Sequence, residues 1–199
     1  MTSIFDYGAG NLRSVQNTLG ELGYKYELVR DSDGLRKATR IILPGVGHFG
    51  QMMRALDALE VRAALLERIS AGVPFLGICL GLQALFDVSE EAPEVQGLGL
   101  YPGTVRRFAA DARVPHMGWN ELELRRESKL VRDLNARPFV YFAHSYYVPE
   151  NERAAAICTY GTPYTAVLEC GNVFGVQFHP EKSGPVGLQI VRNFMELRC

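Results

Sequence analysis

Residues 73–83 read VPFLGICLGLQ. The apolar run before Cys79 predicts a buried parallel strand, and the residues after it predict a helix that reaches Phe86. Gly77 and Gly81 flank the cysteine, and glycine allows a sharp strand-to-helix turn without a Cβ clash. Such a turn exposes one side chain at the carboxyl end of a strand, where open α/β sheets keep their sites. The alternative is a buried structural cysteine between two packing glycines.

Strands and helices alternate on both sides of this turn. Strands are expected over residues 3–7, 24–29, 40–43 and 73–78, and helices over residues 12–22 and 52–69. This order predicts a parallel sheet with right-handed crossovers. Further strands are expected over residues 99–101, 114–117, 139–147, 155–160, 165–169 and 173–178, before a last helix over residues 185–197. We therefore expect an α/β fold: a three-layer, open, mostly parallel sheet flanked by helices, with an antiparallel extension, in one domain over residues 1–199.

The composition excludes several classes of protein. The 199 residues are 47% apolar and 22% charged with a net charge of −1, as in an ordinary globular domain without a nucleic-acid partner. The first residues, MTSIFD, do not resemble a signal peptide, and no apolar run is long enough to cross a membrane. The cysteines at 79, 158, 170 and 199 lack the spacing of a metal site or a disulfide framework, which favours the reducing cytoplasm. Cys158 and Cys170 are expected in the core, and Cys199 in solvent.

The tripeptide His179-Pro180-Glu181 follows the last predicted strand. Pro180 disfavours helical geometry at His179, so an extended segment is expected, and residues two apart in such a segment point the same way. Glu181 can then orient an imidazole whose other nitrogen faces the Cys79 thiol, as in a catalytic triad. A thiol with an ordinary pKa of about 8.5 is only about 3% ionised at pH 7, so a reactive cysteine needs such a partner. The alternative is a surface histidine beside a surface glutamate. The other histidines, His48, His116 and His144, are expected to pack or form hydrogen bonds.

Residues 45–50, GVGHFG, match the dinucleotide fingerprint GxGxxG. That site needs an acid at the end of the next strand, and here the next strand ends at Cys79. A second use of these glycines is an oxyanion site, in which the N–H groups of this strand end and of Leu80 face a developing negative charge. Gln83 lies one helical turn beyond the cysteine and can hold the polar end of a small substrate, although an exposed helix glutamine is equally common.

These motifs together resemble those of the class I glutamine amidotransferases. The resemblance is carried by PGVG (residues 44–47), GICLGLQ (77–83) and GVQFHPE (175–181). Further segments are similar to the glutaminase subunits of imidazole glycerol phosphate synthase: DYGAGN (6–11), PHMGWN (115–120), YFAHSYY (141–147) and Lys182-Ser183. The likeness runs from the first strand to the last helix and implies a flavodoxin-like core.

The resemblance implies that glutamine is hydrolysed to glutamate and ammonia through a glutamyl thioester on Cys79, without metal or cofactor. His179 would act as base and then as acid, and Glu181 would orient it. The implied oxyanion donors are the N–H groups of Val46 and Leu80, the first after a peptide flip that Gly45 and Gly47 permit. The residues implied to hold the amino-acid end of the substrate are Gly47, Gln83, Ser145 and Tyr146.

The resemblance also implies a heterodimer with a (β/α)₈ cyclase that receives the ammonia through an internal channel. The cyclase would convert a phosphoribulosyl-formimino carboxamide nucleotide into imidazole glycerol phosphate and an aminoimidazole carboxamide ribotide, a lyase step of histidine biosynthesis. The residues implied to lie at or near the partner face are Asn11, Trp119, Asn120 and Lys182. Two alternatives remain: a glutaminase of the aminobenzoate, anthranilate or pyridoxal phosphate pathways, and a catalytically silent module with the same fold.

Overall fold

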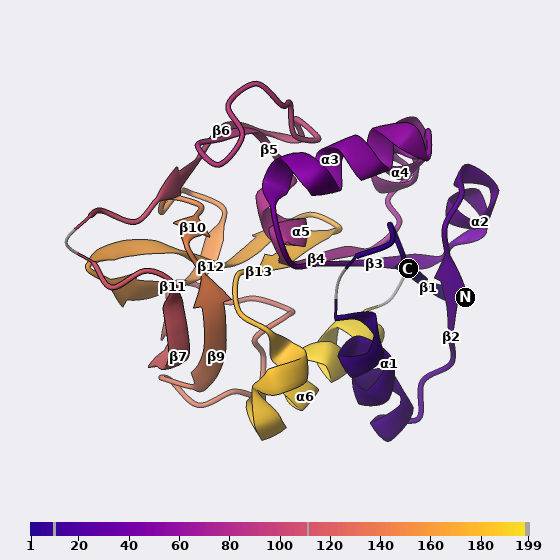
Figure 1. The fold of residues 1–199 in the computed structure, drawn as a ribbon. Helices are drawn as coiled ribbons and strands as arrows, with labels where there is room; N and C mark the ends of the chain where they lie inside the picture. Colours follow the sequence, from indigo (N-terminus) through magenta and orange to yellow (C-terminus); the bar gives the residue numbers. More distant parts are fainter. Residues whose placement is uncertain (10, 111, 198–199) are drawn as a thin grey trace.

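The computed structural model describes residues 1–9, 11–110 and 112–197 (Figure 1). Within them, the largest sheet has eight strands in the order β2-β1-β3-β4-β13-β12-β11-β8. Its strands are β1 (Thr2–Phe5), β2 (Tyr26–Val29), β3 (Arg40–Gly45), β4 (Phe75–Cys79), β8 (Glu123–Leu124), β11 (Ala154–Tyr160), β12 (Thr162–Cys170) and β13 (Val173–Val176). The first five strands in this order, β2, β1, β3, β4 and β13, pair in parallel. The last three, β12, β11 and β8, continue the sheet in antiparallel fashion. The predicted α/β fold is confirmed.

Helices cover both faces of the parallel part of the sheet. The helices are α1 (Leu12–Glu21), α2 (Ser32–Lys37), α3 (Phe49–Ala58), α4 (Arg62–Ser70), α5 (Leu80–Gln83) and α6 (Gly184–Met195), with a 3₁₀ turn η1 (Pro180–Lys182) before the last. Figure 1 shows α3 and α4 on one face and α1 and α6 on the other. None of the helices in the described part of the chain is long and apolar enough to cross a bilayer.

Successive side chains of the inner strands enter two separate cores, because strand side chains alternate between the faces of a sheet. Ile41 and Leu43 of β3 pack in the cluster that includes α3 and α4, whereas Ile42 between them packs with residues of α1 and α6. A fully buried side chain of this kind contributes about 1.5–3 kcal/mol. The inner strands are thus apolar on both faces, and the carboxyl end of β4 is packed between the two cores.

Smaller sheets extend the molecule beyond β12. These are a three-stranded sheet of β5 (Phe86–Ser89), β6 (Tyr101–Arg107) and β10 (Tyr146–Tyr147), and an antiparallel pair of β7 (His116–Glu121) and β9 (Phe139–His144). In Figure 1, β7 and β9 lie next to the β11–β12 end of the main sheet. The short connection between β9 and β10 brings these two sheets together beside β4.

The structure corrects several predicted elements. The helix predicted over residues 52–69 is two helices, because the chain turns between α3 and α4 with Glu60 in the left-handed region at φ 53°. The helix predicted to reach Phe86 ends at Gln83 and is followed by β5, and residues Ser32–Lys37, for which no helix was predicted, form helix α2. Cys158 is buried as predicted, but Cys170 ends β12 and is exposed. Gly10 and Cys199 lie outside the described residues.

The tight packing of the β4–α5 turn gives a first prediction. A Cβ on Gly81 would overlap the carbonyl oxygen of Leu43, so we expect Gly81→Ala to lower the free energy of unfolding by about 2–4 kcal/mol. Gly20→Ala is the matched control, because a Cβ on this helix α1 glycine meets no atom within 4 Å. It should raise stability by about 0.5–1 kcal/mol. Urea unfolding compares the two, and equal stabilities would contradict the close packing of the turn.

Candidate functional site

Cys79 stands at the turn between β4 and α5 in a strained backbone conformation. Its φ of 53° and ψ of −104° lie in a region that a residue with a side chain enters only at a cost of about 1–3 kcal/mol. Gly77 and Gly81 allow β4 and α5 to approach closely, because a Cβ on Gly77 would overlap the carbonyl group of Gly81. The packed neighbours therefore hold the cysteine in a conformation that it would not adopt alone.

His179 and Glu181 lie beside Cys79 because β13 pairs in parallel with β4. The carboxylate Oε1 of Glu181 is 2.9 Å from Nδ1 of His179, and both side chains are only 3% exposed. Burial alone would lower the pKa of His179, but hydrogen bonds to Cys79 and Glu181 outweigh it and raise the pKa to about 10. The imidazole is therefore a cation at neutral pH, placed between the sulfur and the carboxylate.

The route by which Glu181 reaches the imidazole differs from the prediction. His179 is extended, with φ −101° and ψ 97°, but residues 180–182 form the 3₁₀ turn η1 instead of continuing the extended segment. The hydroxyl of Ser183 donates to the His179 carbonyl (2.7 Å) and its oxygen accepts from the Tyr141 N–H (3.0 Å), which ties this turn to β9. Proline is well tolerated at the first position of a helical turn. Pro180 disfavours helical geometry only in the residue before it, His179, and not in the residues after it.

Gln177 is a site residue that the sequence reasoning missed. Its Nε2 donates to the sulfur of Cys79 (3.6 Å), and its Oε1 accepts from the Gln83 carboxamide (3.1 Å). The side chain is completely buried. Its position two residues before His179 was an available signal, since both side chains leave the end of β13 on the same face.

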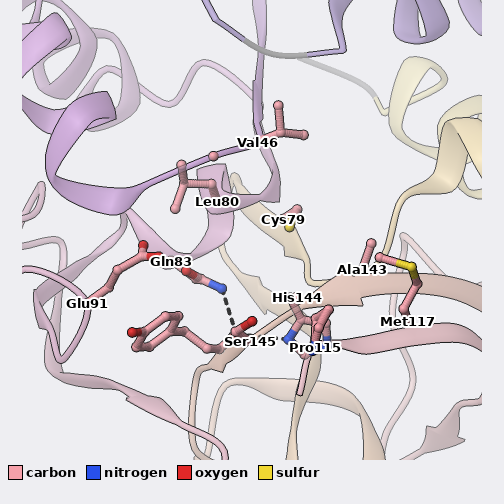
Figure 2. Close-up of a pocket in the computed structure, with 12 residues that line it drawn as sticks. Val46, Cys79, Leu80, Gln83, Glu91, Pro115, Met117, Ala143, His144 and Ser145 are labelled. Atoms are coloured by element: carbon pink, nitrogen blue, oxygen red, sulfur yellow. Dashed lines mark hydrogen bonds between the residues drawn. The ribbon is translucent and has the colours of Figure 1, made fainter. Parts of the chain in front are cut away.

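A pocket of about 200 Å³ opens at the Cys79 sulfur (Figure 2). It contains the residues predicted for the oxyanion site and for substrate binding: Val46, Gly47, Leu80, Gln83, Ser145 and Tyr146. The other lining residues are Glu91, Pro115, Met117, Ala143 and His144. In Figure 2 the sulfur lies between Leu80 and His144, with the Gln83 and Glu91 side chains further along the pocket. The structure therefore brings together residues from four separate motifs.

Gln83 and Glu91 give the far end of the pocket its polarity. The Gln83 amide nitrogen donates to the Tyr146 carbonyl (2.8 Å) and to Gln177, which leaves its carboxamide oxygen to accept from a ligand. Glu91, which the sequence reasoning missed, follows β5 and accepts from the Phe49 N–H (2.7 Å) at the start of α3. In the sequence, Glu91 was marked only as the second residue of the acidic pair Glu90-Glu91, which follows the short strand β5. A carboxylate and an amide oxygen that line one pocket suit the ammonium group of an amino acid.

The glycine-rich end of β3 lies directly against the turn. A Cβ on Gly45 would come within 2.7 Å of the Leu80 Cβ, so this glycine allows the two backbones to meet. Gly47 has a φ of 95°, and the Val46 carbonyl accepts from the Tyr7 hydroxyl (3.4 Å). Val46 and Leu80, the predicted oxyanion donors, both line the pocket that contains the sulfur. His48, which follows Gly47, caps helix α3, because its Nδ1 accepts from the Gly50 N–H (3.1 Å).

Trp119 and Lys182, two of the residues predicted at the partner face, meet around one aromatic ring. Trp119 is 56% exposed and contacts Tyr141 edge-on at 6.1 Å between centroids, while the Lys182 ammonium lies 5.9 Å from the same ring. Asn120 lies on the opposite face of β7, where it donates to the Thr159 carbonyl (3.3 Å). Asn11 accepts from the Ser14 hydroxyl (2.8 Å) beside the first turn of α1. The surface around Trp119 also exposes Met117 and Phe139.

Comparison with known proteins shows the family to which this chain belongs. The model of the class-I glutamine amidotransferases matches residues 3–197. The chain belongs to the class-I glutamine amidotransferase family. A crystal structure of a glutamine amidotransferase, 21% identical, superimposes with a TM-score of 0.77 and covers 98% of this chain and 97% of that one. This likeness confirms the fold.

Two curated relatives are much closer in sequence. The subunit HisH of imidazole glycerol phosphate synthase from Moorella thermoacetica is 48% identical over 98% of this chain and 94% of its own length. The chloroplastic imidazole glycerol phosphate synthase hisHF of Arabidopsis thaliana is 46% identical over 98% of this chain, but only 34% of its own length is matched. This amidotransferase is therefore a glutamine amidotransferase subunit of the HisH type, which disfavours the alternative pathways considered above.

Proposed function

We propose that this amidotransferase domain, residues 1–199, hydrolyses glutamine to glutamate and ammonia with Cys79, His179 and Glu181 as its triad. The observation that carries the proposal is the buried His179 ring beside Cys79, 2.9 Å from the Glu181 carboxylate, where hydrogen bonds to Cys79 and Glu181 raise its pKa. A cation beside the sulfur favours the thiolate, which is the nucleophilic form. No metal or redox group enters this reaction. The three described cysteines are free, which suits a cytoplasmic enzyme with a thiol nucleophile.

The reaction divides into two halves on the same sulfur. The Cys79 sulfur attacks the side-chain amide carbon of glutamine, and the carbonyl oxygen becomes an oxyanion that the Val46 and Leu80 N–H groups stabilise. The carbon–nitrogen bond breaks as His179 gives its proton to the leaving nitrogen, which departs as ammonia. A water molecule then loses a proton to His179, attacks the thioester carbon and releases glutamate and the free cysteine. Glu181 keeps the imidazole oriented throughout.

The amino-acid end of glutamine would lie at the polar end of the pocket. Gln83 and the Glu91 carboxylate would accept from the substrate ammonium, and Gly47, Ser145 and Tyr146, which line the same pocket, would hold the rest of this end. This assignment adds Glu91 to the predicted set. It also gives Gln177 a role at the sulfur, where its amide donates a hydrogen bond that favours the anionic form.

We further propose that a cyclase subunit receives the ammonia in a heterodimer and uses it to make imidazole glycerol phosphate and the carboxamide ribotide. The Arabidopsis relative supports a division of labour, because most of that synthase has no counterpart in this chain. The partner face would centre on the exposed Trp119, with Lys182 beside it and Asn11 and Asn120 nearby.

Glutamate release from glutamine, measured with the purified chain alone and with a cyclase subunit and its nucleotide, tests this function. We expect slow release by the chain alone and faster release in the complex. Release in neither mixture would overturn the glutaminase assignment. Equally fast release in both mixtures would support the glutaminase activity but contradict its control by the cyclase subunit.

The partner face gives a separate prediction. Trp119→Ala should weaken binding of the cyclase subunit by about 2 kcal/mol or more, roughly 30-fold in Kd, because large exposed aromatic side chains dominate interfaces. Leu28→Ala is the matched control, since Leu28 is also an exposed apolar residue but lies on β2, at the far edge of the main sheet. Titration calorimetry measures both. Loss of affinity in the Leu28 variant alone would place the interface elsewhere.

A further inference from the structure

A chain of hydrogen bonds runs from the half-buried Asn120 on β7 through three buried side chains to the wall of the pocket. The Asn120 amide nitrogen lies 3.5 Å from Nε2 of His116, and Nδ1 of His116 lies 3.2 Å from the Tyr164 hydroxyl. The same hydroxyl is 3.3 Å from Nε2 of His144, whose Nδ1 lies 2.8 Å from the Tyr146 carbonyl oxygen. The register of β7 and β9 places His116 directly opposite His144. We call these four side chains and the carbonyl the β7 relay.

The carbonyl at its end gives the β7 relay a single direction. A carbonyl oxygen only accepts, so Nδ1 of His144 carries the hydrogen and Nε2 is the acceptor. The Tyr164 hydroxyl must then donate to His144, and its oxygen accepts from Nδ1–H of His116. This leaves Nε2 of His116 to accept from the Asn120 amide. Every donor in the relay therefore points toward the pocket.

Burial keeps both imidazoles in the form that this direction requires. Tyr164 is fully buried, and His116 and His144 are 4% and 6% exposed. Burial lowers the pKa of His116 to about 4 and that of His144 to about 3. Both rings are neutral at physiological pH, so each retains one donor and one acceptor nitrogen. Aromatic packing alone would not need this arrangement, since Phe108 and Phe142 already fill the same cluster.

The relay ends on an atom that also holds Gln83. The Tyr146 carbonyl accepts from His144 on one side and from the Gln83 amide (2.8 Å) on the other, which uses both of its lone pairs. Tyr146 and its neighbour Ser145 form a wall of the pocket, and Gln83 continues through Gln177 to the sulfur of Cys79. A shift of this carbonyl would displace the substrate-binding wall and the Gln83 side chain together.

We propose that His144 is a positioning residue for glutamine, holding the Tyr146 carbonyl through its Nδ1–H while Tyr164 and His116 hold the imidazole in that tautomer. This role rests on the proposed glutaminase function and adds residues that do not react themselves. Loss of the Nδ1–H donor should impair binding of the amino-acid end of the substrate and leave the chemistry at the sulfur largely unchanged.

Two amide variants at the same position test the proposal. His144→Asn places an amide nitrogen as many bonds from the backbone as Nδ1, whereas His144→Gln places it at the Nε2 position. We expect a KM for glutamine within about twofold of wild type for His144→Asn and a rise of about five- to tenfold for His144→Gln, the loss of one hydrogen bond. The kcat of both should stay within about threefold. Equal KM values for the two variants, or a fall confined to kcat, would overturn the proposal.

A second pair of variants keeps the test independent of folding defects at His144. Tyr164→Phe removes only the hydroxyl of the relay and should raise KM about threefold. Tyr160→Phe is its control: Tyr160 stacks on the His116 ring at 3.9 Å, but its hydroxyl donates to the Arg113 carbonyl outside the relay. An unchanged KM in Tyr164→Phe, or the same rise in Tyr160→Phe, would contradict the relay.

Modification of Cys79 separates this proposal from the glutaminase function. The rate with iodoacetamide, which has no amino-acid end, should be the same in wild type and His144→Gln. The rate with a glutamine-like diazoketone should fall about fivefold in the variant. If wild type hydrolyses no glutamine, the proposed function fails, and the ratio of these two rates still decides whether His144 positions the pocket.

Discussion

Replacement of Cys79 by alanine should lower kcat/KM for glutamine at least about 10⁴-fold, because no other group at the site can form the thioester. The same loss is expected with and without the cyclase subunit. Glutamate release measured with a coupled dehydrogenase assay detects it. Cys158→Ala is the control, since Cys158 is a buried residue of β11 and is absent from the pocket lining. Comparable activity in the Cys79 variant would contradict a covalent mechanism.

The strained backbone at Cys79 makes a matching prediction for stability. Glycine accepts a φ of 53° with a ψ of −104° far more readily than alanine does. Cys79→Gly should therefore be about 1 kcal/mol more stable than Cys79→Ala, although we expect both to be inactive. Urea unfolding at one pH measures the difference. A glycine variant less stable than the alanine variant would show that the turn is not strained.

The second large effect concerns the His179–Glu181 pair. His179→Ala should lower kcat about 10²–10⁴-fold, because the leaving nitrogen then lacks its general acid. Glu181→Gln keeps the imidazole but removes a charge and a hydrogen bond that raise its pKa. Its kcat/KM should therefore decline on the basic side at lower pH than that of wild type, in which the pKa of His179 is raised to about 10. If kcat/KM declined at the same basic pH in Glu181→Gln and in wild type, the proposed role of Glu181 would be contradicted.

The same pKa shift makes stability depend on pH in a defined direction. The folded-state pKa of His179 is about 10, above the ordinary 6.5, so the folded protein binds this proton more tightly than the unfolded chain. The stabilisation is fully present below pH 6.5 and is lost as the pH rises toward 10. Because Glu181→Gln lowers this pKa, the variant should lose less stability between pH 7 and 10 than wild type.

The sequence predicted the parts of the site that depend on local geometry. The glycines around Cys79 predicted the turn because close backbone approach requires them, and alternation of apolar strands with helices predicted which strand ends meet. The residues that it missed come from pairings between distant segments. Gln177 meets the sulfur only because β13 inserts beside β4, and Glu91 enters the pocket only because β5 turns back toward α3. The position of Gln177 two residues before His179 pointed toward the first contact, but no local spacing encodes the second.

Element boundaries were predicted less well where tertiary packing overrides local pattern. The apolar period continues from α3 into α4 because both helices cover the same core, so the turn at Glu60 left no trace in that pattern. Cys170 fits the strand pattern, but it is the last residue of β12 and follows the half-buried Glu169, beyond the buried run of that strand. Likewise, the 3₁₀ turn at η1 depends on the contact of Ser183 with β9.

The central claim is that the Cys79 sulfur, made nucleophilic by a histidine from a distant strand, attacks the side-chain amide of a bound glutamine. Mass spectrometry of the complex after treatment with the glutamine-like diazoketone tests it most directly. The account predicts one adduct, on Cys79, that excess glutamine prevents and that forms far more slowly in His179→Ala. An adduct on Cys158 or Cys170 instead, or no adduct that glutamine can prevent, would contradict it.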